Sequence, residues 1–286
     1  MPELPEVEAA RRGIAEQLLD IPIVRHDLVL PKLIVAPDGL GVDALIDRRI
    51  ESAERHGKYL TLRLGDLAAV IHLKLAGQIV ARGDAIPGFA AGHPVPAYDA
   101  PLPHKSTHLT LTFDNGALLY LTDIRHWARV HLMSVDDLPA YFAPLRLGPD
   151  AIGPDFTREV FHARIRTRTL ARLKPMLLDQ TFIAGLGNIY VDEALYRARL
   201  HPERLARTLT DEEVDRLYDA IVAILAIAVP IGGASILNGK ASPDHGDFPF
   251  IHGRKGNPCL NCGAEILKTR VDDRGTYLCP VCQVVS

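Results

Sequence analysis

The chain has 286 residues, of which 48% are hydrophobic and 23% charged, so it is not a disordered chain and is long enough for about two domains. Its longest apolar run, Ile221–Ile231, contains Pro230 and is shorter than the roughly 18 residues that cross a bilayer. The start of the chain is acidic, unlike a secretory signal, so we expect a cytoplasmic protein without membrane contacts. The net charge of -3 does not favour a nucleic acid partner by itself.

The first predicted element is a helix close to the N-terminus. Pro5 suits its first turn, and the acids Glu6 and Glu8 suit the positive end of the helix dipole. Pro2 and Glu3 would project directly ahead of the helix. Its buried face is predicted to comprise Val7, Ala10, Ile14, Ala15 and Leu18.

Pro2 becomes a free secondary amine if Met1 is removed, which is common when the second residue is small. An α-amino group has a pKa of about 7.7–8.0, so an appreciable fraction is neutral and nucleophilic near neutral pH. An amine of this kind that attacks a sugar carbon forms an iminium ion, and Glu3 could act as the general acid. From these residues alone, an acidic helix cap without a catalytic role is the alternative interpretation.

Residues 1–135 are predicted to form an antiparallel β-sandwich domain. Asp114–Gly116 is typical of a hairpin turn, and the proline-rich range Gly83–Pro103 predicts a loop. Antiparallel strands at the observed spacing favour a sandwich. The predicted strands are Lys58–Leu64, Leu67–Leu75, His108–Phe113 and Leu118–Thr122.

Residues 150–230 are predicted to form a helical domain. Pro175 suits the first turn of a helix over Met176–Gln180, and a tight turn with two glycines follows it. Asn188 suits the N-cap of a second helix that runs from Ile189 to about Arg199. The backbone N–H groups at the start of this helix could bind a phosphate, and the Asn188 amide could either cap the helix or contact that phosphate.

A third helix is predicted from a capping box of Thr210 and Glu213, and Pro230 ends it. The range 231–250 beyond it is rich in turn-forming residues and is predicted to be a long loop. The apolar stripe of the helix is assigned to the core and comprises Val214, Leu217, Tyr218, Ile221, Val222, Leu225, Ala228 and Val229.

Positive charge is concentrated in the C-terminal half of the chain. Arg158–Lys174 contains six basic residues against the single acid Glu159, and the tail from Ile251 onward is also basic in balance. A basic stripe of this kind suits a polyanion, although an ordinary solvated helix face has the same composition.

Residues 251–286 are predicted to form a zinc finger. Their four cysteines, in two C-x2-C pairs sixteen residues apart, match a zinc pattern, whereas disulfides or chance spacing are the alternatives. Four thiolates leave no open position, so the zinc, one ion per chain, would be structural. Glu265–Val271 and Thr276–Leu278 are predicted to form a hairpin with Arg274 at its tip. The predicted ligands are Cys259, Cys262, Cys279 and Cys282.

Four separated motifs resemble the formamidopyrimidine-DNA glycosylase family, in the order that this family has them. They are "PELPEVE" from Pro2, "GKYL" from Gly57, "GLGNIY" from Gly185 and the cysteine-containing tail that begins "GRKGNPC" at Gly253. The resemblance implies an α+β fold: an N-terminal antiparallel β-sandwich, a C-terminal helix-two-turns-helix domain and a zinc finger, with DNA bound in the cleft between them.

The resemblance also implies a monomeric base excision repair enzyme that acts on the DNA of the nucleoid. It would flip an oxidised purine, formamidopyrimidine or 8-oxoguanine, out of damaged duplex DNA and combine glycosylase with AP lyase activity. Pro2 would attack the sugar and Glu3 would protonate the opening ring. The resulting Schiff base would lead to β and δ elimination.

The resemblance also implies roles for further residues, which stand at the positions of functional residues in the family. Lys58 resembles the lysine that assists base release and elimination, and Arg274 resembles the finger arginine of the later elimination. His72 and Asn188, together with Arg274, correspond to the residues that bind phosphates. Glu6 matches an acid close to the nucleophile, where a capping role is equally plausible.

The chain departs from the family where the family fills the space left by the flipped base. Leu75 stands in place of a methionine, and Trp127 in place of a phenylalanine, so both positions keep an apolar plug. Arg125 matches the arginine that reads the partner base. A DNA-binding histidine of the family has no direct counterpart, and His104 or Lys105 is the candidate to replace it.

Two other functions are compatible with the sequence. One is an endonuclease VIII-like enzyme for oxidised pyrimidines, although that branch usually opens with Pro-Glu-Gly-Pro. The other is a catalytically silent DNA-binding protein, against which the presence of Pro2, Glu3 and Lys58 argues, because binding alone requires none of them.

Overall fold

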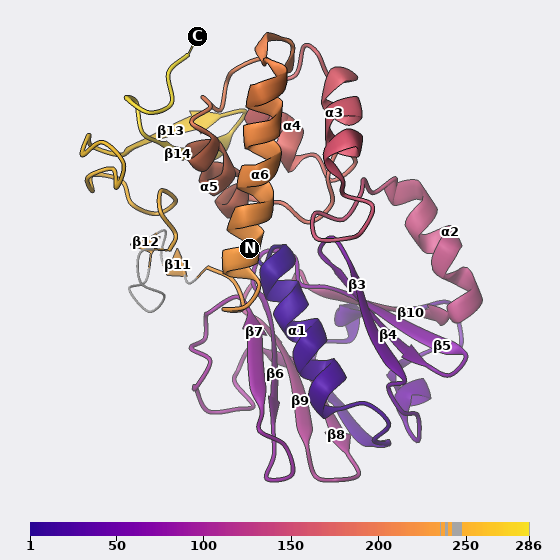
Figure 1. Cartoon of the computed structure of the whole chain (residues 1–286). Coiled ribbons are helices and arrows are strands. Elements are labelled where there is room, and N and C mark those ends of the chain that lie inside the picture. Colours follow the sequence, from indigo (N-terminus) through magenta and orange to yellow (C-terminus); the bar gives the residue numbers. More distant parts are fainter. Residues whose placement is uncertain (235, 238–239, 242–247, 286) are drawn as a thin grey trace. The chain divides into compact units, whose positions relative to one another are not determined.

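The computed structural model describes residues 1–234, 236–237, 240–241 and 248–285 (Figure 1). The chain divides into two compact units, Met1–Arg146 and Leu147–Ser286. No helix of the described residues is long and apolar enough to cross a membrane.

The N-terminal unit contains two five-stranded sheets. In spatial order, the first consists of β1 (Ile23–Leu28), β8 (Thr107–Phe113), β9 (Leu118–Asp123), β6 (Gly77–Arg82) and β7 (Phe89–Gly92). The second consists of β2 (Ile34–Val35), β10 (Arg129–Ser134), β5 (Leu67–His72), β4 (Tyr59–Leu64) and β3 (Ser52–His56). All neighbouring strands are antiparallel except β2 and β10.

The core of this unit takes apolar side chains from both sheets, including Ile79 and Leu121 of the first sheet and Leu62 and Val130 of the second. The predicted β-sandwich is therefore confirmed. The hairpin over Asp114–Gly116 joins β8 and β9 as expected. The prediction that Gly83–Pro103 is wholly a loop is wrong, because β7 lies within this range and pairs with β6.

The helix α1 (Leu4–Gln17) packs along β7 and β3 (Figure 1). Its buried face includes Val7, Ala10 and Ile14, as predicted, and Ala15 is half-buried. Short helical segments complete the unit: η1 (Pro31–Leu33), η2 (Val42–Leu45), η3 (Val135–Asp137), α2 (Leu138–Phe142) and η4 (Ala143–Leu145).

The C-terminal unit begins with helices: α3 (Arg158–Arg166), α4 (Leu173–Leu178), α5 (Asn188–Ala198), η5 (Ala206–Thr208) and α6 (Asp211–Ala228). The capping box of Thr210 and Glu213 at the start of α6 is confirmed. Val222 was wrongly assigned to the buried stripe, since it is 42% exposed and Ile224 is buried instead.

Two helix boundaries differ from the prediction. The helix α4 begins at Leu173 and ends at Leu178, so it starts and ends earlier than Met176–Gln180. The N-cap of α5 is Gly187, and Asn188 is already the first residue of the helix. The Asn188 side chain caps nothing because it bonds to a distant backbone carbonyl.

The remainder of the unit contains two short hairpins. β11 (Ile236–Leu237) pairs with β12 (Lys240–Ala241) inside the range predicted as a long loop. Residues 235, 238–239 and 242–247 of that predicted loop lie outside the described residues, as does residue 286 of the predicted finger.

The second hairpin consists of β13 (Leu267–Val271) and β14 (Arg274–Leu278). Its turn consists of Asp272 and Asp273, both with positive φ. Arg274 is therefore the first residue of β14, paired with Val271, and does not form the tip that the sequence predicted.

Candidate functional site

The residues ahead of α1 are buried rather than projecting. Pro2 is buried, and Glu3 is only 1% exposed. The Glu3 backbone N–H donates to Glu6 Oε2 at 2.8 Å, which is half of a reciprocal capping box between the two acids. Glu6 therefore holds the backbone next to Pro2, which goes beyond a diffuse interaction with the helix dipole.

Glu8, predicted to suit the helix dipole, is buried and lies at the centre of an ion cluster. Its carboxylate accepts hydrogen bonds from Arg11, Arg12 and Arg55 at 2.7–3.1 Å. Burial by itself raises the pKa of Glu8, but the hydrogen bonds from Arg11 and Arg55 outweigh it and lower the pKa to about 2. Glu8 is therefore ionised at neutral pH.

Arg55 links this cluster to Lys58. Its Nε donates to Glu8 Oε2 at 3.0 Å, and its Nη1 donates to the carbonyl oxygen of Gly57 at 3.0 Å. Lys58, which directly follows Gly57, is 7% exposed. The Arg55 guanidinium thus fixes the backbone beside Lys58 to the helix that begins after Pro2 and Glu3.

His72 is the last residue of β5. Its ring packs edge-on against Tyr59 with centroids 4.6 Å apart, and its Nδ1 accepts the Lys74 backbone N–H at 2.9 Å. Burial lowers the pKa of His72 to about 3, and the positive charges of Lys74 and Lys58 contribute. The ring is therefore neutral at physiological pH, and its Nε2 carries the proton and can donate it to an acceptor.

An exposed loop follows β9. The fully buried carboxylate of Asp123 accepts the backbone N–H groups of Arg125, Trp127 and Ala128 at 2.7–2.8 Å. Trp127 is 51% exposed, and the Arg125 guanidinium lies 6.0 Å from its ring centroid. Three charge-assisted bonds to one buried anion hold this tip, so an arginine and an aromatic ring are presented on a fixed backbone.

The other predicted contact residues of this unit lie at the same end of the first sheet. Leu75 is half-buried in the turn that leads into β6, whose first residue, Gly77, pairs with Asp123. His104 and Lys105 lie in the turn before β8. The backbone of that turn accepts the Asp123 N–H at Ser106, at 2.9 Å.

In the C-terminal unit, Asn188 and Arg274 are brought together through one carbonyl group. The Gly275 carbonyl oxygen, next to Arg274, accepts from Asn188 Nδ2 at 2.8 Å and from Lys174 Nζ at 2.9 Å. Lys174 is 0% exposed and also donates to Asp192 Oδ1 at 2.6 Å. The buried Oδ1 of Asn188 has no hydrogen-bond partner among the described residues.

Most basic side chains of Arg158–Lys174 form ion pairs with acids of the same unit. Arg158 binds Asp215 and Asp219, Arg168 binds Asp179, and Arg172 binds Glu203 and Asp272. Much of this stretch therefore stabilises the unit, and its charge is largely balanced by acids that are distant in sequence.

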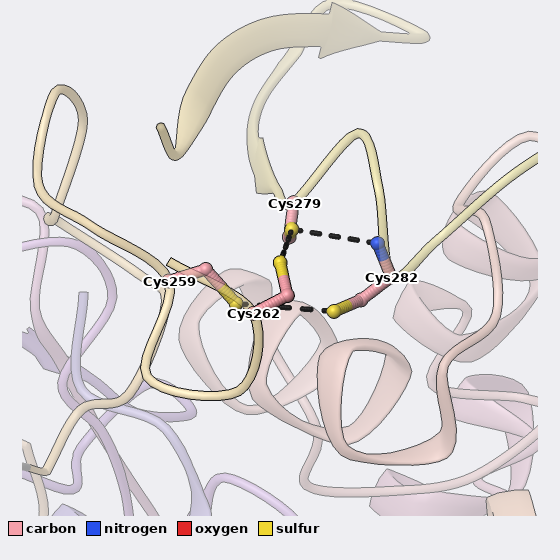
Figure 2. Close-up of side chains that lie close together, drawn as sticks. All are labelled: Cys259, Cys262, Cys279 and Cys282. Atoms are coloured by element: carbon pink, nitrogen blue, oxygen red, sulfur yellow. Dashed lines mark hydrogen bonds between the residues drawn. The ribbon is translucent and has the colours of Figure 1, made fainter. Parts of the chain in front are cut away.

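The four cysteine Sγ atoms converge, with all of them within 4.8 Å of one another (Figure 2). A tetrahedral Zn²⁺ with Zn–S bonds of about 2.3 Å separates its sulfurs by about 3.8 Å, and the observed pairs Cys259–Cys282 and Cys262–Cys279 are 3.9 and 3.5 Å apart. The Asn261 side-chain amide donates to Cys282 Sγ at 3.0 Å, a bond that supports a thiolate. The spacing of the four sulfurs therefore fits a zinc site.

Several functional neighbours escaped the sequence reasoning. Arg55 bonds to Glu8, 47 positions away, and Lys174 bonds to Gly275, 101 positions away, so no local spacing indicates these contacts. Asp123 bonds to the loop directly after it, two to five positions away, and was overlooked. Glu8 was noticed, but only as a dipole acid. Its position on the helix face that also carries Arg11 and Arg12 was the one local signal of an ion cluster.

Three family models match the chain. The Formamidopyrimidine-DNA glycosylase N-terminal domain matches residues 1–130, and the Formamidopyrimidine-DNA glycosylase H2TH domain matches residues 147–239. The zinc finger found in FPG and IleRS matches residues 256–284. With the cysteine cluster, this match confirms the predicted structural zinc.

Proteins similar over their full length are found among characterised relatives and solved structures. A formamidopyrimidine-DNA glycosylase of Heliobacterium modesticaldum is 41% identical and covers 99% of this chain and 100% of that protein. A Lactococcus lactis FPG variant bound to Fapy-dG-containing DNA is 35% identical, with a TM-score of 0.83 and 99% of both chains covered. A MutM structure with carbocyclic 8-oxo-G-containing DNA is 34% identical, with a TM-score of 0.82 and coverage of 99% and 100%.

Proposed function

Because this chain belongs to the formamidopyrimidine-DNA glycosylase family of base excision repair enzymes, we propose that it removes oxidised purines from duplex DNA through a Schiff base at Pro2. Support for the purine class comes from similar structures that hold Fapy-dG and 8-oxo-G DNA. The observation that carries the proposal is the buried Pro2–Glu3 pair, which is fixed at the start of α1 and linked through Arg55 to the backbone at Lys58.

Removal of Met1 exposes the Pro2 nitrogen as the nucleophile. This nitrogen attacks C1′ of the damaged nucleotide, and the bond from C1′ to the base breaks as the base leaves with a proton. Glu3 protonates the ring oxygen O4′, so the sugar opens and the nitrogen forms an iminium ion with C1′. The capping bond from Glu3 N–H to Glu6 keeps this acid one residue from the amine.

The iminium ion is the electron sink for strand cleavage. Loss of a proton from C2′ expels the 3′ phosphate, and a second elimination expels the 5′ phosphate. Lys58 assists base release and proton transfer. Arg274 is proposed for the later elimination and for phosphate binding.

DNA contacts are proposed for both units. The neutral His72 donates from Nε2 to a phosphate, and Asn188 binds another phosphate. Leu75 and Trp127 fill the space that the flipped nucleotide leaves, while Arg125 reads the partner base. His104 and Lys105 extend this contact surface, because their turn bonds directly to Asp123 at the start of the loop.

Borohydride trapping on a duplex with one 8-oxoguanine tests the proposal. The wild-type chain should form a covalent adduct, Pro2→Gly should lose it, and Glu3→Gln should bind the duplex but release no base. Pro31→Gly, at an exposed proline of the same unit, is the matched control and should trap normally. Full strand cleavage by Pro2→Gly would exclude Pro2 as the nucleophile.

The same assay separates the alternative functions. Tight duplex binding without any trapped adduct would indicate a catalytically silent binder. A panel of duplexes with oxidised purines and oxidised pyrimidines addresses the endonuclease VIII-like alternative, because Trp127 and Leu75 depart from the usual residues at the base-replacing positions. Faster excision of oxidised pyrimidines would contradict the purine assignment.

A further inference from the structure

The segment that contains β7 runs along α1 toward the start of the chain. At one end, the Gly88 N–H donates to the Gln17 side chain at 2.8 Å. One step further, the Phe89 ring lies so close to Gly13 that a Cβ there would overlap it. Since Gln17 ends α1, the chain from Gly88 onward approaches the N-terminal end of α1, where Pro2 and Glu3 lie (Figure 1).

His93 directly follows β7, on the side toward the N-terminal end of α1. Its backbone N–H donates to the Gly77 carbonyl oxygen at 2.9 Å, and Gly77 pairs with Asp123, where the exposed loop begins. The charged groups that act on the His93 ring are the amino terminus, Arg125 and Asp123. The His93 ring is therefore within electrostatic range of the Met1 amino terminus and of the loop arginine, Arg125.

The surrounding bonds fix the position of His93. The fully buried side chain of Gln78 donates from Nε2 to the carbonyl oxygens of His93 and Pro96, at 2.9 and 2.8 Å. The Tyr98 hydroxyl donates to the Gly92 carbonyl oxygen at 2.8 Å. Gly92 has φ +105° and no room for a Cβ against Gly77, so the close approach of the two strands requires glycine.

The ring of His93 presents one free donor. Its Nδ1 accepts the Val95 backbone N–H at 3.2 Å, so the neutral ring carries its proton on Nε2. Burial lowers the pKa of His93, and the positive charge of the amino terminus lowers it further. Nε2 makes no hydrogen bond to any of the described residues, so its N–H is available to a ligand.

We propose that His93 is a further substrate-contacting residue, which donates its Nε2–H to an oxygen of the damaged nucleotide that reacts at Pro2. This inference rests on the proposed function. The acceptor is the carbonyl oxygen of the oxidised base or an oxygen of an adjacent phosphate, since both lie within a few ångströms of the attacked sugar carbon. The amino terminus and Arg125 add positive charge around the His93 ring, which favours an oxygen acceptor over a hydrogen-bond donor as its ligand.

Single-turnover rates of His93→Phe, His93→Gln and wild type test this contact. Phe keeps the size of the ring without a donor, whereas Gln keeps a donor. We expect His93→Phe to slow base release and trapping by about 10- to 100-fold, and His93→Gln to recover most of the rate. His26→Phe is the matched control, because His26 lies on β1 at the opposite edge of the same sheet, and its rate should be unchanged.

A duplex with an abasic site identifies the acceptor. A defect of His93→Phe that persists on this duplex assigns the contact to a phosphate, and a defect that disappears assigns it to the base carbonyl. Thermal unfolding checks that the variants are folded, and His93→Ala replaces His93→Phe if the larger ring destabilises the chain.

Rates of His93→Phe within twofold of wild type on both duplexes would overturn the inference, as would His93→Gln being as slow as His93→Phe. Failure of the proposed function is a separate outcome. Pro2→Gly that still traps DNA rejects the nucleophile whatever His93 does, whereas an inactive Pro2→Gly with a normal His93→Phe rejects the His93 contact alone.

Discussion

Glu8→Gln is expected to destabilise the N-terminal unit by about 3 kcal/mol at pH 7. The substitution removes the negative charge that Arg11, Arg12 and Arg55 share. The Arg55 side chain is only 6% exposed, so it cannot recover full hydration when its partner is neutral. The loss of one member of a buried pair leaves an uncompensated charge, which is the costly case.

The pKa of Glu8 gives the same magnitude independently. It is lowered from 4.5 to about 2, although burial alone raises it, because Arg11 and Arg55 bond to the ionised form. At about 1.4 kcal/mol per pKa unit, this corresponds to about 3 kcal/mol of stability. Since the folded pKa lies below the unfolded one, this stability is complete well above pH 4.5 and is lost as the pH falls toward 2, with about 0.8 kcal/mol gone by pH 4.

Urea unfolding between pH 4 and pH 8, followed by circular dichroism, measures this effect. Glu16→Gln, an exposed acid on the same helix, is the control and should change the unfolding free energy by less than about 0.5 kcal/mol. Glu8→Gln should also slow DNA cleavage, because Arg55 holds the Gly57 carbonyl beside Lys58. A variant as stable as wild type at pH 7, or a stability difference that does not shrink toward pH 4, would refute the reasoning.

Three shorter predictions concern other parts of the molecule. Asp123→Ala should weaken the binding of lesion duplexes about tenfold or more, because three loop N–H groups lose their acceptor. Fluorescence anisotropy measures this binding, and Asp114→Ala, at the exposed hairpin turn, is the control. Cys262→Ser should lower the zinc content measured by atomic emission and weaken duplex binding, and normal zinc in this variant would contradict the ligand assignment. Lys174→Met should lower the unfolding free energy by about 3–5 kcal/mol in a thermal or urea titration, because Asp192 stays buried with too little positive charge.

Features that depend on neighbouring residues were predictable from the sequence. The capping box of Thr210 and Glu213 requires residues three positions apart, and the hairpin over Asp114–Gly116 requires one turn. The zinc ligands follow from two fixed spacings, and the sandwich from alternating strands. The family resemblance is confirmed for the same reason, since its motifs are short and contiguous.

Features that depend on distant residues were not predictable in the same way. The strand β7 has only four residues, Phe89–Gly92, and no β-branched residue, so its pairing with β6 and its packing on α1 are what make it a strand. Asn188 satisfies the sequence preference for an N-cap, but Gly275, 87 residues away, offers it a carbonyl acceptor. From the sequence, Glu8 can be explained by the helix dipole alone, because its partner Arg55 lies on β3, 47 positions away.

The charge distribution leads to a related conclusion about DNA recognition. The number of basic residues in Arg158–Lys174 predicted a polyanion site there. In the structure, however, acids of the same unit form ion pairs with many of these side chains. The donors that we propose near the amino terminus are instead histidine rings, His72 and His93, whose Nδ1 atoms accept backbone N–H groups and whose Nε2–H groups remain to donate. Neutral donors cost less to desolvate than cations when a nucleotide displaces water, so recognition close to the proposed nucleophile can depend on hydrogen-bond direction without a large net positive charge. Donors of this kind are compatible with the net charge of -3.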